Sequence, residues 1–260
     1  MLIHSTPISV SAIIPVRDEA QCIAGVVQAF LALKTSTGEP LLTEVIVADN
    51  GSSDGSGAIA RAAGARVLVV PKVGYGQACF EAGKVANGNV LLYIDGDGAC
   101  DPKDTYALID LIADGADLAI GVRDKASPGA MTSPQRFGNG LACMLLRLIW
   151  GVPTPDLGPF RAIRRSAYDA VAMQDRSYGW TVEMQIRAQQ IGLRVAQCSV
   201  AWHVRVAGHS KVSGTVRGVI GAGIGILGMI STLWVAQMRR PLQQKQPFHS
   251  TNRPKENFYV

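Results

Sequence analysis

The first 200 residues predict an α/β protein in which a mostly parallel central sheet is flanked by helices. Short runs rich in Val, Ile and Leu alternate with longer segments of helical periodicity, which is the βαβαβ order of parallel sheets. Polar and turn-forming residues follow these runs, at the strand ends where ligands gather in such folds. With 260 residues and 48% hydrophobic content, the chain can bury the core of one large domain.

Each expected element is predicted from its own pattern. Compact apolar runs bounded by turn residues predict strands, and apolar residues that recur every three to four positions predict helices. The expected strands span residues 9–15, 44–49, 65–69, 90–95, 117–122, 160–163 and 194–200, and the expected helices span 19–33, 53–63, 76–86, 103–112, 137–150 and 181–191.

The most informative segment is residues 91–97, an apolar run that ends in two carboxylates one residue apart. Because residues i and i+2 of a strand point to the same side, Asp95 and Asp97 can reach one ligand together. Two carboxylates suit Mg²⁺ or Mn²⁺, which bind one or two carboxylates plus substrate phosphates. The segment therefore predicts a diphosphate substrate, and a plain Asp-Gly turn is the alternative.

The net charge of +5 belongs to the C-terminal part of the chain. From His203 onward there are eight Lys or Arg and one acidic residue, Glu256. Residues 218–238 carry no charge, and as a helix they would extend about 31 Å, close to the thickness of a bilayer core. This segment predicts membrane contact, either as a span or as an interfacial helix whose glycines lower its hydrophobicity. We expect no nucleic-acid partner.

The cysteines and histidines do not form a metal or disulfide pattern. Five cysteines are scattered without Cys-x-x-Cys spacing, which speaks against a zinc site and for a reducing compartment. The four histidines also lack metal-ligand spacing. No basic segment followed by a long apolar stretch opens the chain, so a cleaved signal peptide is not expected.

The turns after the first and second expected strands, residues 15–19 and 49–55, are typical of nucleotide sites. Residues 49–55, Asp-Asn-Gly-Ser-Ser-Asp-Gly, can cap the next helix and expose backbone N–H groups, although capping alone would explain them. Gly74-Tyr75-Gly76 opens the third helix, but a lone Gly-x-Gly does not make a dinucleotide site. The sequence contains neither a Walker A motif nor a Gly-x-Ser-x-Gly elbow.

Six motifs in order resemble glycosyltransferase family 2, in the branch of the dolichyl- or polyprenyl-phosphate mannosyl- and glucosyltransferases. They lie between residues 9 and 215 and read Ile14-Pro15-Val16-Arg17-Asp18-Glu19, Asp49-Asn50-Gly51-Ser52-Ser53-Asp54-Gly55, Lys72-Val73-Gly74-Tyr75-Gly76, Asp95-Gly96-Asp97, Gly158-Pro159-Phe160-Arg161 and Gly208-His209-Ser210-Lys211. The resemblance implies a GT-A fold, a UDP- or GDP-hexose donor, a divalent cation, Mg²⁺ or Mn²⁺, and inversion at the sugar carbon.

The resemblance also implies roles for single residues. Asp95 and Asp97 would bind the metal and the diphosphate, and Asp49 would read the base. The other implied donor-binding positions are Pro15, Arg17, Glu19, Gly51, Ser52, Lys72 and Gly76. Two positions depart from the family pattern: Arg17 stands where an aromatic residue is common, and Ala99 stands where a Gln often assists the metal.

The acceptor decides which further residues are needed. A lipid phosphate is already an anion near neutral pH, so arginines would position it and no strong base is required. The basic residues that match acceptor-binding positions are Arg123, Arg136, Arg205 and Lys211, of which Arg136 and Arg205 join Asp97 and Asp156 in the expected catalytic set. A hydroxyl acceptor would need a base, for which Asp156 is the candidate, although it could equally shape a turn. Glu183 lies near a family position close to the site, with a helix-surface charge as the alternative.

The expected organisation is a catalytic domain over residues 1–215, a membrane-associated apolar helix over 216–240 and a flexible tail over 241–260. The expected function is transfer of a hexose, glucose or mannose, to a polyprenyl phosphate at the cytoplasmic face of the cell membrane. Two alternatives remain: a family 2 enzyme with a lipid or soluble hydroxyl acceptor, and a non-catalytic nucleotide-sugar-binding membrane protein. The intact pair of Asp95 and Asp97 argues against the second.

Overall fold

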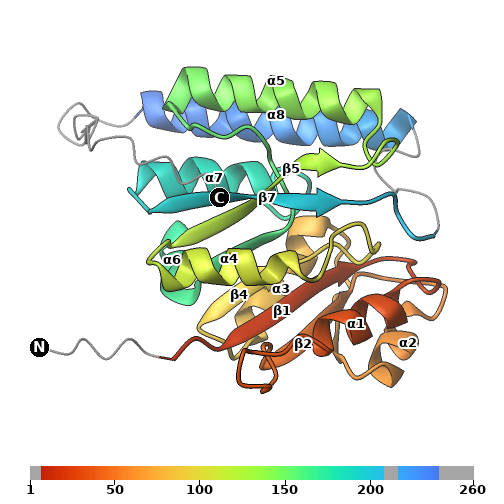
Figure 1. Ribbon diagram of the computed structural model, residues 1–260. Coiled ribbons are helices and arrows are strands. Elements are labelled where there is room, and N and C mark those ends of the chain that lie inside the picture. The colour runs from red at the N-terminus through yellow and green to blue at the C-terminus, as the bar shows by residue number, and fades with distance from the viewer. Residues whose placement is uncertain (1–6, 208–215, 240–260) are drawn as a thin grey trace, which may run out of the picture.

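The computed structural model of the protein describes residues 7–207 and 216–239, which fold into one sheet covered by helices on both faces (Figure 1). The strands are β1 (Val10–Val16), β2 (Glu44–Asp49), β3 (Arg66–Val69), β4 (Val90–Tyr93), β5 (Leu118–Ala126), β6 (Arg161–Arg164) and β7 (Val195–Trp202). The helices are α1 (Ile23–Leu31), α2 (Ser56–Ala62), α3 (Tyr75–Val85), α4 (Asp104–Ala113), α5 (Ser133–Trp150), α6 (Arg165–Val171), α7 (Trp180–Gln190) and α8 (Val216–Met238). Each expected element is present, and α6 is a helix that the sequence pattern did not predict.

The sheet is mostly parallel, as predicted, with the strand order β3-β2-β1-β4-β6-β5-β7. Only β6, among the described strands, runs antiparallel to both its neighbours, β4 and β5. The chain passes from β1 outward to β2 and β3 and then returns to β4 on the other side of β1. This makes a topological switch point between the ends of β1 and β4, which is where open α/β sheets bind ligands.

The core is built in layers because both faces of the sheet are apolar. Along β1, Ala12 and Ile14 pack into a cluster with α1 and α4, and Ile13 packs into a second cluster on the other face with α3, α6 and α7. Strands buried on both faces read as nearly continuous apolar runs, which explains the sequence pattern.

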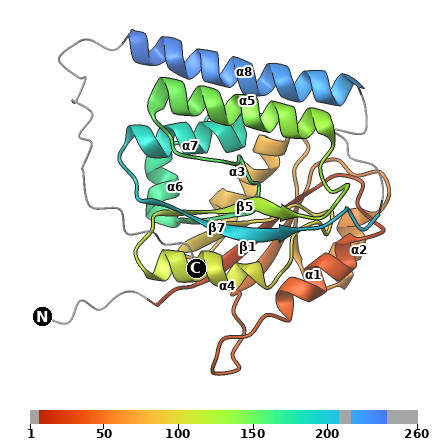
Figure 2. The same cartoon turned by 45° about the horizontal axis from the view of Figure 1, so that its top comes forward.

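A third apolar cluster joins α5, α7 and α8 above that second face (Figure 2). The helix predicted from residue 137 begins earlier, at Ser133, because Thr132 and Gln135 form a capping box and a Pro occupies the first turn. The expected C-terminal helix, α8, is long enough and, over Gly221–Met238, apolar enough to cross a membrane by length and composition. Here one side of it packs on α5 and α7, with Ile230 and Leu233 buried.

Candidate active site

A cavity of about 770 Å³ opens at the carboxyl ends of β1 and β4. Its walls come from the turn after β1, the start of α3, the Asp-Gly-Asp turn after β4, the segment before α5 and the segment after β7. The predicted site residues that line it are Pro15, Arg17, Glu19, Asp95, Asp97, Arg123 and Arg205. The volume lies within the range of about 300–1,000 Å³ that is usual for small-molecule and cofactor sites.

Asp95 and Asp97 lie together in this cavity, as their spacing predicted. Asp95 Oδ1 accepts a hydrogen bond from the Tyr75 hydroxyl at 3.2 Å. Burial raises the pKa of Asp95 to about 7, and the negative charge of Asp97 adds to the shift. Asp97 Oδ2 lies 3.2 Å from Nη2 of Arg205. Two neighbouring carboxylates, one of them buried, concentrate negative charge at this point of the cavity, and this donor set fits a divalent cation.

Arg205 reaches the carboxylates because the segment after β7 crosses the turn after β4. The backbone N–H of His203 donates to Ala99 O at 2.6 Å, and that of Val206 donates to Asp97 O at 3.1 Å. Arg205 Nη1 then lies 2.6 Å from Glu19 Oε1 on the turn after β1. One side chain therefore links the turns after β1 and β4. Lys211, a further predicted residue on this segment, lies outside the described residues.

Several predicted residues lie outside the cavity lining, namely Asp49, Gly51, Ser52, Lys72, Gly76, Arg136 and Asp156. The turn after β2 instead supports the turn after β1. Ser52 Oγ accepts a hydrogen bond from the Asp18 N–H, and Ser56 Oγ accepts one from the Glu19 N–H at 2.8 Å. Asp49 accepts from the Ser52 N–H at 2.9 Å. These contacts give residues 49–55 a supporting role for the turn after β1, and the N-cap of α2, Gly55, has no side-chain hydrogen bond.

Asp156 and Arg123 form a buried, bidentate ion pair. Arg123 Nε and Nη2 lie 2.8 and 2.7 Å from the two oxygens of Asp156, and the Arg123 N–H donates to the same carboxylate. Burial by itself would raise the pKa of Asp156, but the hydrogen bonds and charge of Arg123 lower it below its usual range. Arg123 also lies over the Trp202 ring, 5.3 Å from its centre. Both oxygens of Asp156 are engaged, so the geometry does not present it as a free base.

The Gly158-Pro159-Phe160-Arg161 motif holds this region by packing. A Cβ on Gly158 would lie 2.1 Å from Gly121 O, so only glycine fits there. The Arg161 side chain is fully buried and donates to the carbonyls of Leu157, Gly158 and Thr181. Burial lowers the pKa of Arg161 to about 10. The motif thus fixes the loop that carries Asp156.

Arg136 lies exposed in the first turn of α5 and donates to Met131 O at 3.2 Å. Its neighbours Thr132 and Gln135 line the cavity. Glu183 is fully buried in α7, not on a helix surface, and accepts hydrogen bonds from the N–H groups of Gln174 and Asp175. It therefore supports the loop before α7.

The structure adds lining residues that the sequence did not single out, including Asn50, Tyr75, Met131, Thr132, Gln135, Tyr178, Trp202 and His203. Asn50 is buried, and its side-chain amide donates hydrogen bonds to Val70 O and Lys72 O and accepts one from the Gly74 N–H. These hydrogen bonds fix the loop that places Tyr75 beside Asp95. An Asn directly after a strand was the available signal. Gly76 allows the same loop to pack closely, since a Cβ there would lie 2.8 Å from Asp175 O.

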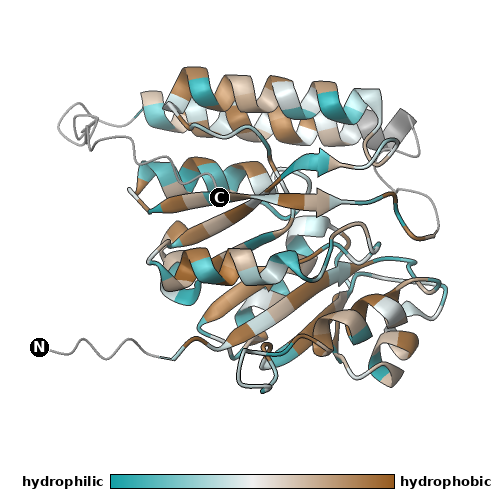
Figure 3. Cartoon of the chain, viewed as in Figure 1, coloured by the Kyte–Doolittle hydropathy of each residue, from teal (hydrophilic) through white to brown (hydrophobic). Residues whose placement is uncertain are grey.

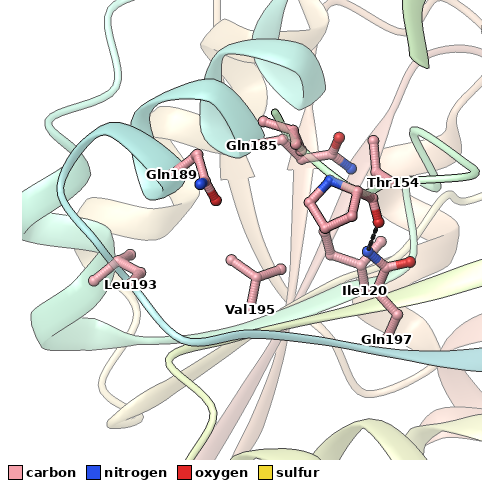
Figure 4. A pocket seen from close by; sticks show the side chains of 9 residues that line it. Ile120, Thr154, Gln185, Gln189, Leu193, Val195 and Gln197 are labelled. Carbon is pink, nitrogen blue, oxygen red and sulfur yellow. Dashed lines mark hydrogen bonds between the residues drawn. The ribbon is translucent and has the colours of Figure 1, made fainter. Parts of the chain in front are cut away.

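A second, smaller cavity of about 180 Å³ lies between α7 and the start of β7 (Figure 4). Its polar walls are amides: Gln185 Nε2 donates to Asp156 O at 3.2 Å and Gln197 Nε2 donates to Pro153 O at 3.1 Å. None of the predicted site residues lines it. The larger cavity is therefore the candidate active site.

The chain matches the family model described as Glycosyl transferase family 2 over residues 11–171. The chain belongs to glycosyl transferase family 2. It is 31% identical over 212 residues to an uncharacterised glycosyltransferase of Mycobacterium bovis, which covers 82% of this chain and 93% of that protein. It is 31% identical over 187 residues to a polyprenol monophosphomannose synthase of Mycolicibacterium smegmatis, covering 66% and 71% of the two chains.

Solved structures share the fold of this glycosyltransferase. Mannosyl-3-phosphoglycerate synthase from Rubrobacter xylanophilus matches with a TM-score of 0.73 and 20% identity, covering 93% of this chain and 78% of that one. Glucosyl-3-phosphoglycerate synthase from Mycobacterium tuberculosis, in complex with Mn²⁺, UDP-glucose and phosphoglyceric acid, matches with a TM-score of 0.66 and 20% identity, covering 86% and 80%. The predicted GT-A fold and the resemblance to family 2 are confirmed.

Proposed function

We propose that this family 2 glycosyltransferase is a metal-dependent, inverting hexosyltransferase that uses UDP- or GDP-hexose and a polyprenyl phosphate at the cytoplasmic face of a membrane. One observation carries the choice of acceptor: the described cavity lining offers no uncommitted carboxylate. Glu19 and Asp97 form ion pairs with Arg205. Asp95, two residues from Asp97, accepts a hydrogen bond from the Tyr75 hydroxyl. A hydroxyl acceptor needs a base to take its proton, whereas a phosphate is already an anion.

The donor half of the site consists of the ends of β1 and β4. Asp95 and Asp97 would hold Mg²⁺ or Mn²⁺, which when bound would offset the charge of the leaving diphosphate. Pro15, Arg17 and Glu19 border the same part of the cavity. The complex of a glucosyl-3-phosphoglycerate synthase of the same fold with Mn²⁺ and UDP-glucose supports this arrangement as a proposal for this chain.

The acceptor half would lie between the segment after β7 and the start of α5. Arg205 already lies inside the cavity, and an incoming phosphate would compete with Glu19 and Asp97 for its guanidinium. Arg136 lies one residue from Gln135 at the rim and Arg123 lines the wall. Arginines bind phosphate through paired N–H groups and bring two anions close together. The name of the mycobacterial polyprenol monophosphomannose synthase supports a lipid phosphate.

A soluble acceptor is the second candidate, because fold neighbours include synthases of phosphoglycerate glycosides. If that acceptor reacts through a hydroxyl, His203 is the cavity-lining side chain that can take its proton. This outcome would replace the lipid-phosphate proposal.

The deciding experiment offers the full chain UDP-glucose and GDP-mannose with three acceptors: a short polyprenyl phosphate, the matching polyprenol and 3-phosphoglycerate. We expect transfer to the polyprenyl phosphate, with inversion seen by NMR of the product. Arg136→Ala should raise the acceptor KM while leaving donor binding nearly unchanged, because the side chain lies outside the donor half. Transfer to the polyprenol or to 3-phosphoglycerate, with none to the lipid phosphate, would overturn the proposal. Donor binding without any turnover would indicate a binding protein.

A further inference from the structure

We propose that α5 and α8 together form the membrane-binding surface of the protein, and that α8 lies in the membrane plane beside α5 rather than crossing the bilayer. The proposal rests on the proposed function only in taking the acceptor to be a membrane lipid. It adds a helix of the catalytic domain to the membrane contact and assigns an orientation to the site.

The outer face of α8 is mostly apolar from Ile224 to Met238, with Ser231 as a polar residue within it. Ile224, Leu227, Trp234 and Met238 are exposed and recur at helical spacing on one side. The opposite side, with Ile226, Ile230 and Leu233, packs into the cluster with α5 and α7. Only one face of α8 is therefore available for lipid, as in a helix that lies at an interface.

The outer face of α5 continues this surface. Phe137 and Leu148 are each 73% exposed and Met144 is half exposed, at positions i, i+7 and i+11 of one helix face. Burial of Ala142, Cys143 and Leu146 on the other side fixes this orientation. Exposed Phe and Leu in one stripe are unusual on a soluble surface and mark an interaction site.

The two helices lie side by side in one outer layer, with α7 beneath them (Figure 2). Their apolar segments are seen together at the top of the molecule (Figure 3). Their outward faces therefore point away from α7 on the same side. Eight of the sixteen exposed large apolar side chains in the described residues belong to these two helices.

The charges on these helices select an anionic lipid surface as the partner. Neither α5 nor α8 contains an Asp or Glu, and the sequence has no acidic residue from 184 to 255. Arg136, Arg147 and Arg239 are exposed on or beside the two helices. Cations beside an apolar stripe bind anionic lipid headgroups, each worth about 1 kcal/mol near the surface.

A second copy of the chain fits this surface less well. A two-fold dimer would bring the same patch of both copies together, and with it Arg147 and Arg239 of each copy. Neither helix has an acidic residue to pair with these arginines, so their charges would repel. An anionic lipid surface attracts them instead.

The surface also leads into the active-site cavity. Met131, Thr132 and Gln135 line the cavity and directly precede Arg136 and Phe137 at the start of α5. A lipid whose chains lie against Phe137 would have its headgroup within reach of the cavity rim. This geometry explains how a phosphate at the membrane surface can reach the site without leaving the bilayer.

Flotation of the full chain with vesicles of phosphatidylcholine and about 30% phosphatidylglycerol tests the proposal. The double variant Phe137→Ser/Leu148→Ser should bind these vesicles at least about tenfold more weakly. The matched control Ile8→Ser/Val69→Ser changes two exposed apolar residues elsewhere and should bind like wild type. Wild-type binding by the α5 variant, with resistance to carbonate extraction, would mean that α8 spans the membrane and would overturn the proposal.

A natural fluorophore gives an independent readout. Of the four tryptophans, Trp150, Trp180 and Trp202 are buried, and Trp234 on α8 is 44% exposed. Addition of vesicles should shift the emission of Trp234 to the blue, and lipids brominated near the headgroup should quench that emission. The Trp234→Phe variant should show neither effect. An unchanged spectrum, or a dimer that Phe137→Ser/Leu148→Ser converts to monomers, would contradict lipid as the partner.

Activity on a short polyprenyl phosphate in detergent separates this proposal from the proposed function. A variant of the same α5 face that leaves Phe137 in place, Met144→Ser/Leu148→Ser, should retain that activity, because both side chains lie outside the cavity and away from its rim. Vesicle binding that depends on α5, without any lipid-phosphate transfer, would refute the function and leave the surface intact. Transfer of the sugar to the lipid phosphate, together with vesicle binding that does not depend on α5, would support the function and refute the proposed surface.

Discussion

Arg205 is the residue that connects the donor carboxylates, since its guanidinium reaches Glu19 at 2.6 Å and Asp97 at 3.2 Å. Burial alone would lower the pKa of Arg205, but the hydrogen bond with Glu19 and the charge of Asp97 raise it, so it stays a cation. It therefore compensates part of the charge that a divalent metal would neutralise. A metal entering beside Asp97 must compete with this guanidinium.

Substitutions on the two sides of this ion pair should act in opposite directions on metal binding. Without donor, Arg205→Gln should bind Mn²⁺ several-fold more tightly, measured by EPR of free Mn²⁺, because the competing cation is gone. Asp97→Asn should lose Mn²⁺ binding and reduce kcat by about a hundredfold or more, an electrostatic loss of about 3 kcal/mol. Full activity of Asp97→Asn in excess EDTA would refute the metal assignment.

Asp156 should matter to stability more than to proton transfer. Asp156→Asn leaves the Arg123 guanidinium buried without its counter-charge, and breaking such a pair costs about 3–5 kcal/mol. Urea unfolding should show this loss, and the exposed Asp110→Asn should show almost none. A stable Asp156→Asn protein that has lost only its chemical step would instead indicate a base.

The pH dependence of this pair has a definite sign. The pKa of Asp156 is lower in the folded protein than its usual value of about 3.9, so the ion pair stabilises the fold above that pH. The contribution is lost as the pH falls through the folded pKa. The stability difference between wild type and Asp156→Asn should therefore narrow below about pH 4.

At the scale of elements, α8 is a packed part of the catalytic domain. One of its glycines contributes to this: a Cβ on Gly225 would lie 3.2 Å from the Tyr178 side chain. Gly179, directly before α7, allows similarly close approach of Met229 on α8. Gly225, one of the glycines that weaken residues 218–238 as a membrane span, thus allows one side of the helix to approach the start of α7. Removing α8 should expose Leu146 and Ile186 as well as detach the protein from membranes.

Two isoleucines of α8 test this packing. Ile230 is 4% exposed and Ile224 is 68% exposed on the same helix. Ile230→Ala should cost about 2–4 kcal/mol of unfolding free energy, through lost burial and a cavity. Ile224→Ala should change stability by less than about 0.5 kcal/mol. Equal, small effects of both changes on urea unfolding would show that α8 is not docked in solution.

At the scale of the whole molecule, the cavity joins segments far apart in the chain. Residues from Pro15 to Arg205 line it, and the contact between Arg205 and Glu19 spans 186 positions. A ligand that binds there touches the ends of β1 and β4 and the segment after β7 at once. Binding should therefore stabilise the domain as a unit.

Thermal unfolding with Mn²⁺ and a nucleoside diphosphate measures this coupling. A ligand at one hundred times its Kd adds about 2.7 kcal/mol. At about 2–4 °C per kcal/mol for a domain of this size, Tm should rise by several degrees. The rise should require both metal and nucleotide and be absent in Asp97→Asn, and the larger response to UDP or GDP would identify the base. An equal rise in Asp97→Asn would contradict the placement of the diphosphate.

The sequence by itself determined the α/β class, the strand order along the chain and the position of Asp95 and Asp97 after a buried strand. These features depend on periodicity and on spacings of a few residues, which local sterics and burial translate directly into strands, helices and turns. The ordered motifs also predicted the family.

The tertiary structure decided which neighbours each side chain has. Only the tertiary structure shows that Arg123 pairs with Asp156, 33 positions away in the chain. It also shows that Ser52 supports the turn after β1 and that Asn50 and Tyr75 line the cavity. It also docked α8 on α5 and left Phe137 and Leu148 facing outward. Contacts between distant segments depend on how the layers pack, and no local pattern in the chain records that packing.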